Sequence, residues 1–424
     1  MWYNNHVMTN RFNDDGLKIS LLGYGAMRMP TVDGRHANGW ARGASNADID
    51  QERLNGQIKY LLDSGVNYFD TSPAYCRGES ESRLGEALQK SGYDRESYII
   101  ATKLSTFAKS QWSLEKSKEM FYSSLKNLRT SYIDNYLLHN IGNGSFSAFK
   151  ARFLDNGALD FLLEQRKRKV IRNLGFSFHG DYRAFQWCMD NHDKCRWDFA
   201  LIQMNYVDWK HANKLNKQNV DAEKLYDELT KRNIPVVVME PLLGGRLAKF
   251  DYAIAKNIQH LKPEATFASW AFRFCASKPN VMCVLSGMSK MEHIEENIDT
   301  FTSFKPLTER ELEHLERAAQ EFVESSYIQC NRCDYCMPCP YGLDIPSILT
   351  FYNDYLSPKK RNVYSAKRIL SSYNKFIPEP MRRAEHCTGC GRCNPHCPQQ
   401  INVSEEVYKI SQLMEAVKDE VFRR

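Results

Sequence analysis

Eight short apolar runs recur along the first three hundred residues, and an amphipathic stretch separates each run from the next. The runs are ISLLGYG (19–25), YFDTS (68–72), YIIATKL (98–104), IDNYLLH (133–139), IRNLGFSF (171–178), FALIQMNY (199–206), IPVVVMEPL (234–242) and VMCVLSGM (281–288). They are rich in Ile, Val and Leu, which is typical of parallel strands that are buried on both faces. The pattern therefore predicts eight parallel strands.

Helix-like periodicity fills the intervals between these runs. Apolar residues spaced three and four apart predict helices over 50–64, 80–91, 113–129, 146–168, 181–191, 221–232, 264–277 and 290–303. Eight strand–helix units predict a (β/α)8 TIM barrel. The alternative is an open doubly wound sheet, which usually carries G-x-G-x-x-G after its first strand. Here that strand ends in GYGAMR (23–28) without the third glycine, and the chain has no G-x-x-x-x-G-K-[ST] loop.

Further elements are predicted around this barrel. Residues 30–49 are rich in Gly, Asn and Asp, which favours a long surface loop after the first strand. Residues 308–325 and 404–422 have helical spacing, and 345–376 is expected to be helical in part.

Composition and charge indicate which kinds of partner, such as membranes or nucleic acids, the protein is not expected to bind. The chain has 424 residues and a formal net charge of +6. No apolar stretch approaches the roughly 20 residues of a membrane helix, and the N-terminus lacks a signal-peptide core, so we expect a cytoplasmic protein without a membrane partner. The densest basic run, 166–169, closes a predicted helix, where positive charge is favourable. No basic stretch is interleaved with aromatic residues, so no nucleic-acid partner is expected.

Two tight cysteine runs carry the most specific signal in the sequence. CNRCDYCMPCP (330–340) and CTGCGRCNPHCP (387–398) hold eight of the thirteen cysteines. Such close neighbours make poor disulfides, whereas C-x2-C-x2-C-x3-C-P is the ligand run of bacterial two-cluster ferredoxins. The second run fits this pattern in full, and the first is one residue short in its last gap. A zinc module is the alternative, although zinc usually takes two C-x2-C pairs per site.

In the two-cluster ferredoxins the fourth cysteine of each run binds the other cluster. This crossed pattern predicts one [4Fe-4S] cluster on Cys330, Cys333, Cys336 and Cys397, and a second on Cys387, Cys390, Cys393 and Cys339. We expect a barrel over 1–306, a connecting helix over 307–326, a small α-rich ferredoxin-like iron–sulfur domain over 327–403 and a C-terminal helix over 404–424. Clusters that only stabilise the fold are an alternative, because metal binding couples directly to folding.

Polar side chains stand at the ends of successive predicted strands, where barrel enzymes place their chemistry. Asp70 ends the second strand and Tyr75 follows it, Lys103 ends the third strand, and His139 ends the fourth. A phenol can give the proton that an alkoxide needs after hydride transfer to a carbonyl, and a nearby ammonium would lower the pKa of that phenol. Asp70 would balance the charge of Lys103, and His139 would hydrogen-bond the carbonyl oxygen. Each residue taken singly also has a purely structural interpretation.

Three stretches, GVNYFDTSPAY (65–75), ATK (101–103) and YLLH (136–139), resemble the catalytic segments of the aldo-keto reductases. The resemblance extends over 12–305. It implies that the family's catalytic tetrad is Asp70, Tyr75, Lys103 and His139, with Tyr75 as the acid and base. It also implies a nicotinamide cofactor, NADP or NAD, that is bound without a Rossmann loop.

The resemblance also implies positions for that cofactor. Ser177 in GFS (175–177) and Gln203 in LIQMNY would hold the nicotinamide carboxamide, and SGMSKMEHIEEN (286–297) resembles the adenosine-binding stretch. The residues expected in that stretch are Ser289, Glu296 and Asn297, of which Ser289 and Asn297 match the branch that includes potassium-channel β subunits.

Several positions depart from the family pattern. Phe178 stands where the family often has Asn, and Met239 and Glu240 stand where it has an aromatic residue and a serine near the diphosphate. The residues that many members use for the 2′-phosphate correspond to Gly287 and His293. A carboxylate beside a diphosphate is electrostatically unfavourable.

The whole chain resembles aldo-keto reductase-like oxidoreductases that carry a C-terminal ferredoxin-type domain. This resemblance implies hydride transfer between a nicotinamide and a small carbonyl or alcohol, with clusters that exchange electrons with ferredoxin or another carrier. A hydride carries two electrons and a cluster takes one, so their coupling normally needs a flavin, which barrels can bind without a recognisable motif. The alternative hypothesis is a redox sensor or electron-transfer subunit whose barrel binds a nucleotide without significant turnover.

Overall fold

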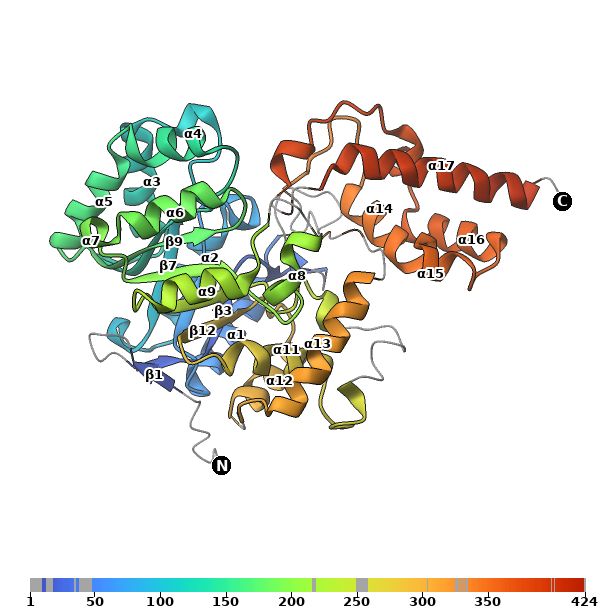
Figure 1. The fold of residues 1–424 in the computed structure, drawn as a ribbon. Coiled ribbons are helices and arrows are strands. Elements are labelled where there is room, and N and C mark those ends of the chain that lie inside the picture. The colour runs from blue at the N-terminus through green and yellow to red at the C-terminus, as the bar shows by residue number, and fades with distance from the viewer. Residues whose placement is uncertain are drawn as a thin grey trace.

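The computed structural model describes residues 10–12, 18–33, 36–37, 48–215, 219–248, 258–302, 304–324, 328, 330, 332, 335–397, 399 and 401–422. Eight strands close into a barrel, and each pairs in parallel with its neighbours (Figure 1). They are β3 (Leu22–Gly25), β6 (Tyr68–Asp70), β7 (Ile99–Leu104), β8 (Ile133–Leu138), β9 (Ile171–Phe178), β10 (Phe199–Gln203), β11 (Val236–Met239) and β12 (Val281–Ser286). All eight lie within the predicted runs, and the predicted barrel is confirmed.

A helix follows each barrel strand and covers the outside of the sheet. These helices are α1 (Gln51–Asp63), α2 (Ser80–Lys90), α3 (Leu114–Asn127), α5 (Ala158–Lys167), α6 (Tyr182–Asp190), α9 (Ala222–Thr230), α11 (Phe267–Ala276) and α12 (Met291–Thr302). Several of these helices have an N-cap side chain. Asp50 accepts a hydrogen bond from the backbone N–H of Arg53 at the start of α1, and Ser113 accepts one from that of Lys116 at the start of α3.

The structure divides two segments that the periodicity predicts as continuous. The predicted helix 146–168 consists of α4 (Phe146–Phe149), a π-turn over Lys150–Leu154 and α5, because Gly157 turns the chain with a φ of 76°. The first predicted strand is split at Leu21, where β2 (Lys18–Ser20) pairs with β1 (Asn10–Phe12) and β3 enters the barrel.

Short elements that the periodicity did not predict complete the barrel. They are α7 (His192–Cys195), α8 (Asp208–Leu215) and four 3₁₀ turns at Tyr75–Gly78, Arg95–Ser97, Lys109–Gln111 and Arg246–Ala248. At the start of the predicted loop 30–49, β4 (Met29–Pro30) pairs with β5 (His36–Ala37), and residues 34–35 and 38–47 of the loop lie outside the described part of the chain.

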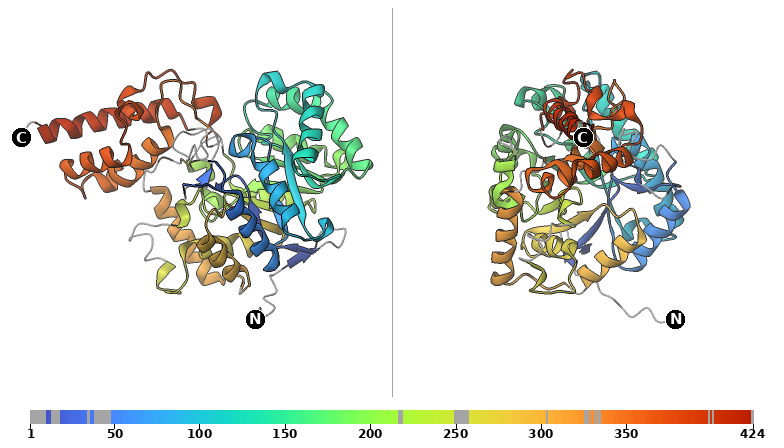
Figure 2. Two further views of the ribbon diagram at one scale, coloured as in Figure 1. Left: turned by 180° about the vertical axis from the view of Figure 1, so that it is seen from behind. Right: turned by 90° about the vertical axis from the view of Figure 1, so that its right-hand side faces the viewer.

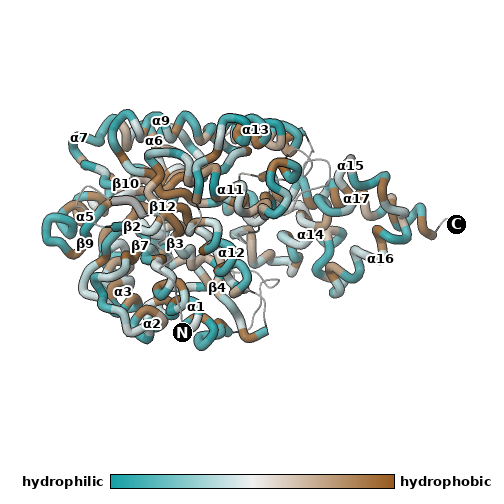
Figure 3. Tube along the Cα trace, turned by 90° about the horizontal axis from the view of Figure 1, so that it is seen from below, coloured by the Kyte–Doolittle hydropathy of each residue, from teal (hydrophilic) through white to brown (hydrophobic). Residues whose placement is uncertain are grey.

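Two apolar layers hold the barrel together. Side chains between the strands and the outer helices form the larger core, and a second group fills the barrel interior, including Tyr68, Leu137, Phe199 and Leu285. In Figure 3, hydrophobic residues are concentrated on the central strands, and hydrophilic residues are frequent on the surrounding helices. The filled interior leaves the ends of the strands as the place for a site.

The C-terminal region has a core of its own beside the barrel (Figure 2). After α13 (Glu309–Glu324), which packs on α8, it contains α14 (Ile345–Phe351), a π-turn (Tyr352–Leu356), α15 (Pro358–Arg361), α16 (Ala366–Phe376), 3₁₀ turns at Pro380–Arg382, Ala384–His386 and Asn394–His396, and α17 (Val403–Phe422). The helices predicted over 308–325 and 404–422 are therefore present. Among the described residues, no helix combines the length and apolar character that crossing a bilayer requires.

Candidate active site

Asp70 and Lys103 form a buried ion pair at the carboxyl ends of β6 and β7. Lys103 Nζ lies 2.6 Å from Asp70 Oδ1 and 2.7 Å from the backbone oxygen of Thr71, and the lysine side chain is fully buried. Burial lowers the pKa of Lys103 and raises that of Asp70, and the attraction between the two charges opposes both shifts. The pair thus holds an ammonium group where the predicted chemistry requires one.

Tyr75 lies directly above this pair, in the 3₁₀ turn that follows β6. Lys103 Nζ is 4.9 Å from the centre of the Tyr75 ring. Burial raises the pKa of Tyr75 well above its usual value, and the charges of Tyr335, Asp70 and Glu240 act in the same direction. The sequence predicted that Lys103 would lower this pKa, but the net shift is upward. Desolvation is the largest influence, and Lys103 is already paired with Asp70.

His139 follows β8 and faces Tyr75 edge-on, with their ring centres 5.8 Å apart. Its Nδ1 lies 2.6 Å from Ser105 Oγ and 3.3 Å from Ser72 Oγ. Burial lowers the pKa of His139 well below 6.5, and the charges of Lys103 and Arg152 act in the same direction. The imidazole is therefore neutral at neutral pH, and its Nδ1 is oriented by hydroxyl groups.

Arg152 is a buried residue that the sequence reasoning did not identify. Its guanidinium donates to three backbone oxygens, at 3.0 Å to Thr106, 3.1 Å to Asn140 and 2.8 Å to His139. It therefore ties the loops after β7 and β8 together directly behind His139. Only the fold shows this role, because the sequence does not indicate which carbonyl groups a lone arginine reaches.

A small cavity of about 50 Å³ brings most of the predicted residues together at this end of the barrel. It is lined by Tyr75, Lys103, His139, Ser177 and Gln203. Ser177 Oγ accepts a hydrogen bond from the backbone of Asn140 at 2.7 Å. Gln203 Nε2 donates to Asp208 at 2.7 Å.

The C-terminal region also contributes to this cavity, through Tyr335 and Gln399. Gln399 Nε2 donates to Gln203 Oε1 at 3.1 Å, and both side chains are buried. Tyr335 packs on Phe107, which in turn lies against His139. Nothing in the sequence indicates that Tyr335 and Gln399 reach the barrel. Tyr335 stands between two predicted cluster ligands, and Gln399 follows a third by two residues, so the sequence associates both with the cysteine runs.

The residues predicted for the adenosine lie apart from this cavity. Ser289 is half-buried in the loop after β12, and its backbone oxygen accepts a hydrogen bond from Gln57. Asn297 on α12 is buried and donates to Ser286 Oγ at 3.0 Å, whereas Glu296 accepts a hydrogen bond from Thr266. The structure thus places these three residues beside one barrel strand but does not bring them into the tetrad's cavity.

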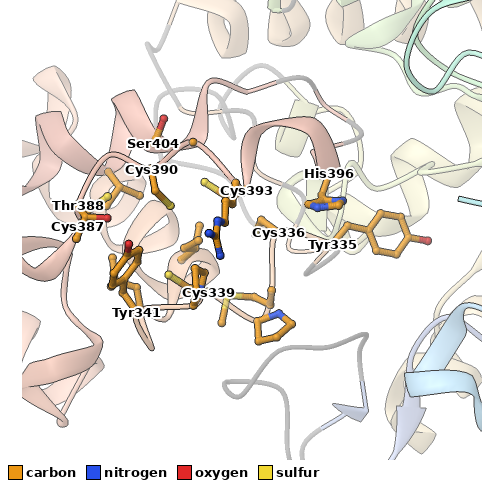
Figure 4. A pocket seen from close by; sticks show the side chains of 18 residues that line it. Tyr335, Cys336, Cys339, Tyr341, Cys387, Thr388, Cys390, Cys393, His396 and Ser404 are labelled. Atoms are coloured by element: carbon orange, nitrogen blue, oxygen red, sulfur yellow. The ribbon is translucent and has the colours of Figure 1, made fainter. Parts of the chain in front are cut away.

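The cysteines gather around a second, larger cavity of about 440 Å³ in the C-terminal region (Figure 4). Cys336, Cys339, Cys387, Cys390 and Cys393 line it. Burial raises the pKa of Cys393 to about 11, and the charges of Cys387, Cys339 and Cys390 add to this rise. Among the described residues, no group of three or more His, Cys, Asp or Glu side chains is placed to hold a single metal ion. In an iron–sulfur cluster, each thiolate binds a different metal atom.

Residues around this cavity connect it to the barrel. Tyr335 lines it from the same loop as Cys336, but Figure 4 shows its ring turned away from the cysteines and towards the barrel. Cys330 and Cys397 are partly buried against the same core, and Cys333 lies outside the described residues. Cys336 and Cys339 thus both lie at the cavity lined by the second cysteine run, and the crossed ligand assignment stays a prediction.

Residues 22–320 match the aldo/keto reductase family. The chain belongs to this family. Residues 329–402 match the 4Fe-4S dicluster domain, which favours iron–sulfur ligands over the zinc alternative. The protein is therefore an oxidoreductase of the aldo/keto reductase type with a C-terminal 4Fe-4S domain.

Relatives of this aldo/keto reductase cover mainly its barrel. L-galactose dehydrogenase of Arabidopsis thaliana is 24% identical over 309 residues, which are 69% of this chain and 87% of the relative. A probable voltage-gated potassium channel subunit beta of the same organism is 22% identical over 72% of this chain and 94% of its own length. An aldo-keto reductase from Bacillus halodurans in its holo form superposes with a TM-score of 0.57 at 22% identity, over 73% of this chain and 96% of that one, which shows the shared fold.

Proposed function

We propose that the barrel transfers a hydride between a nicotinamide nucleotide, NADP or NAD, and a small carbonyl or alcohol substrate. The observation that carries this proposal is the cavity at the carboxyl ends of the strands, because Tyr75, Lys103, His139, Ser177 and Gln203 all line it. This cavity therefore combines a proton donor, an ammonium group and a neutral imidazole with two polar side chains that can hydrogen-bond an amide.

The nucleotide, when bound, supplies or accepts the hydride. In reduction, Tyr75 gives its proton to the carbonyl oxygen. Lys103, held by Asp70, stabilises the phenolate that remains. Neutral His139 donates a hydrogen bond to the same carbonyl oxygen from Nε2, while Ser105 engages Nδ1.

The remaining predicted residues would hold the nucleotide. Ser177 and Gln203 are proposed to bind the carboxamide, since both line the cavity beside Tyr75. Ser289, Glu296 and Asn297 are proposed to bind the adenosine further round the barrel, where they flank the end of β12.

The iron–sulfur domain is proposed to exchange electrons with ferredoxin or another carrier. It would hold two [4Fe-4S] clusters with crossed ligands, one of them on Cys339, Cys387, Cys390 and Cys393 around the large cavity. The clusters, when bound, each hold a single electron. Tyr335 lines both the cluster cavity and the catalytic cavity, which supports electron exchange between the two sites. A flavin is a candidate third cofactor, because a hydride must be divided into single electrons.

A second candidate function is a redox sensor whose barrel binds the nucleotide without significant turnover. Gln399 favours it, because its amide already donates to the Gln203 oxygen that a carboxamide would use. Glu240 also lines the catalytic cavity and adds a carboxylate where phosphate would approach.

Substitution of Tyr75 distinguishes the two functions. Tyr75→Phe removes the proton donor, so NADPH-dependent reduction of a panel of aldehydes should fall by about 10²- to 10⁴-fold while nucleotide binding is retained. Tyr136→Phe is the matched control, because this buried hydroxyl belongs to the outer core of the barrel and should leave turnover unchanged. Absence of turnover in the unsubstituted protein would instead support the sensor.

A further inference from the structure

Glu240 places a carboxylate at the catalytic cavity, although the proposed proton transfer does not use one. Among the Asp, Glu, Lys and Arg residues that the structure describes, only Lys103 and Glu240 line this cavity. Lys103 is paired with Asp70, whose carboxylate lies 2.6 Å from its ammonium group. The charge of Glu240 contributes to the raised pKa of Tyr75, so this carboxylate is close enough to act on the reacting hydroxyl group. The described lining therefore has an excess of negative charge, which favours a cationic ligand.

The backbone at Glu240 has an unfavourable conformation that its neighbours hold in place. Glu240 directly follows β11 and has a φ of 57°, in the left-handed region that residues other than glycine rarely adopt. Its carbonyl oxygen accepts a hydrogen bond from Asn205 Nδ2 at 3.1 Å. Asn205 is fully buried, and its Oδ1 accepts from the backbone N–H groups of Val207 and Asp208. Such backbone strain is concentrated at functional sites, which favours a role for Glu240 beyond packing.

The neighbours of Glu240 indicate which cation it would meet. Ser177 and Gln203, the proposed partners of the nicotinamide carboxamide, line the same cavity, as does Met239. Glu240 therefore lies beside the proposed position of the nicotinamide ring. Transfer of a hydride to the carbonyl carbon removes two electrons from this ring and leaves it with a positive charge, whereas the reduced ring is neutral. A carboxylate beside the ring consequently stabilises the oxidised form more than the reduced form.

Burial of the carboxylate strengthens this effect. Glu240 is half-buried, and its Oε2 is buried. Solvent and salt screen such a charge less than they screen a charge at the surface. Repulsion between a carboxylate and the diphosphate would instead weaken the binding of both forms alike, because both carry the same phosphates. A difference in affinity between the two forms therefore reports on the ring.

We propose that Glu240 is a redox-tuning residue, which binds the positively charged, oxidised nicotinamide ring in preference to the neutral, reduced ring. The proposal rests on the proposed function, and it assigns a role to a position at which this chain departs from the family pattern. Stabilisation of the oxidised form makes the bound nucleotide a stronger hydride donor. A tenfold preference corresponds to a two-electron potential that is lower by about 30 mV.

Two matched substitutions test the proposal. Glu240→Gln removes the charge and keeps the size of the side chain. Glu96→Gln is the control, because it removes the same charge from an exposed turn before β7, at the opposite end of the barrel. Calorimetry on the full-length protein with its clusters measures the affinities for NADP⁺ and for tetrahydro-NADP, a reduced analogue whose ring is neutral and gives no hydride. We expect the unsubstituted protein and Glu96→Gln to prefer NADP⁺ equally, and Glu240→Gln to lose about tenfold of this preference.

The outcomes separate this proposal from the proposed function. The proposal would be overturned if the unsubstituted protein did not prefer NADP⁺, or if both substitutions changed the ratio of affinities equally. Equal tightening of both nucleotides in Glu240→Gln would also overturn it, since the carboxylate would then act on the phosphates; aldehyde reduction by the same protein would leave the proposed function intact. A preference that falls only in Glu240→Gln, without reduction of any aldehyde, would support the role of Glu240 and refute hydride transfer to a carbonyl. Absence of binding of either nucleotide would overturn both.

Discussion

His139 is neutral because the fold gives its positive form no support. It is buried beside Lys103 and Arg152, and these charges and desolvation lower its pKa well below 6.5. In the unfolded chain the same imidazole takes up a proton near pH 6.5. Acid therefore favours unfolding: the contribution of His139 to stability is complete above about pH 6.5 and is lost as the pH falls towards the folded-state pKa.

Replacing His139 should reduce this acid sensitivity. In His139→Asn, the thermal midpoint should decline less between pH 7.5 and pH 5.5 than in the unsubstituted protein, because no buried imidazole resists protonation there; one unit of pKa shift corresponds to about 1.4 kcal/mol. Anaerobic thermal unfolding at several pH values measures it, with the exposed His260→Asn as the control. Identical pH profiles for His139→Asn and the unsubstituted protein would contradict this account.

Individual residues show where sequence reasoning succeeds. Asp70, Lys103 and His139 could be placed from the ends of apolar runs, because parallel strands in a barrel bring these ends together. The raised pKa of Tyr75 could not be predicted, because it depends on burial and on the approach of Tyr335 and Glu240 from other elements. The roles of the tetrad and of the nucleotide contacts stay predictions.

Arg152 connects two elements of the site. Its guanidinium satisfies carbonyl oxygens of Thr106, His139 and Asn140 from a fully buried position, and burial lowers its pKa to about 10. The π-turn over Lys150–Leu154 carries it across the loops after β7 and β8. The break in the predicted helix 146–168 therefore coincides with a structural element of the site.

Removing the Arg152 guanidinium should destabilise the barrel. Arg152→Met leaves three buried carbonyl oxygens without their donor, which should cost about 3 kcal/mol or more and lower the thermal midpoint by about 6 °C or more. Arg183→Met is the control, because Arg183 pairs with Asp181 at the surface and such pairs contribute about 0–1 kcal/mol. Equal midpoints in the two variants would show that the Arg152 contacts contribute little.

Segments far apart in the sequence meet at the catalytic cavity, and local patterns do not reveal this. Apolar periodicity predicts strands and helices because each depends on near neighbours. The contacts of Tyr335 with Phe107 and of Gln399 with Gln203 depend on how the C-terminal region docks on the barrel. Cysteine spacing indicated an iron–sulfur domain, but it could not indicate that Tyr335 and Gln399 of this domain line the cavity of the barrel.

At the scale of the molecule, the C-terminal domain contributes Tyr335 and Gln399 to the cavity at the end of the barrel. Gln399 follows the proposed ligand Cys397 by two residues, and its primary amide donates to Gln203 Oε1. A nicotinamide carboxamide would present the same kind of N–H group to the same oxygen. Gln399 is therefore expected to compete with the nucleotide.

Gln399→Ala removes this competing amide and should therefore tighten nucleotide binding by about three- to tenfold, which corresponds to the contribution of one neutral hydrogen bond. Anaerobic fluorescence titration with NADPH measures the affinity, and Gln412→Ala, on the exposed face of α17, is the control. Weaker binding in Gln399→Ala would mean that this side chain assists the nucleotide instead of competing with it.

We propose that the barrel and the clusters form one redox unit. The number of electrons balances, because two clusters together take the two electrons that one reduced nicotinamide gives, and a proton is released. An anaerobic visible spectrum of the full-length protein, recorded before and after addition of NADPH, tests this proposal and also reveals any flavin. We expect a broad iron–sulfur absorption that decreases when NADPH is added. Clusters that are present but unchanged by NADPH would contradict electron exchange between the two sites and leave the barrel as a separate carbonyl reductase.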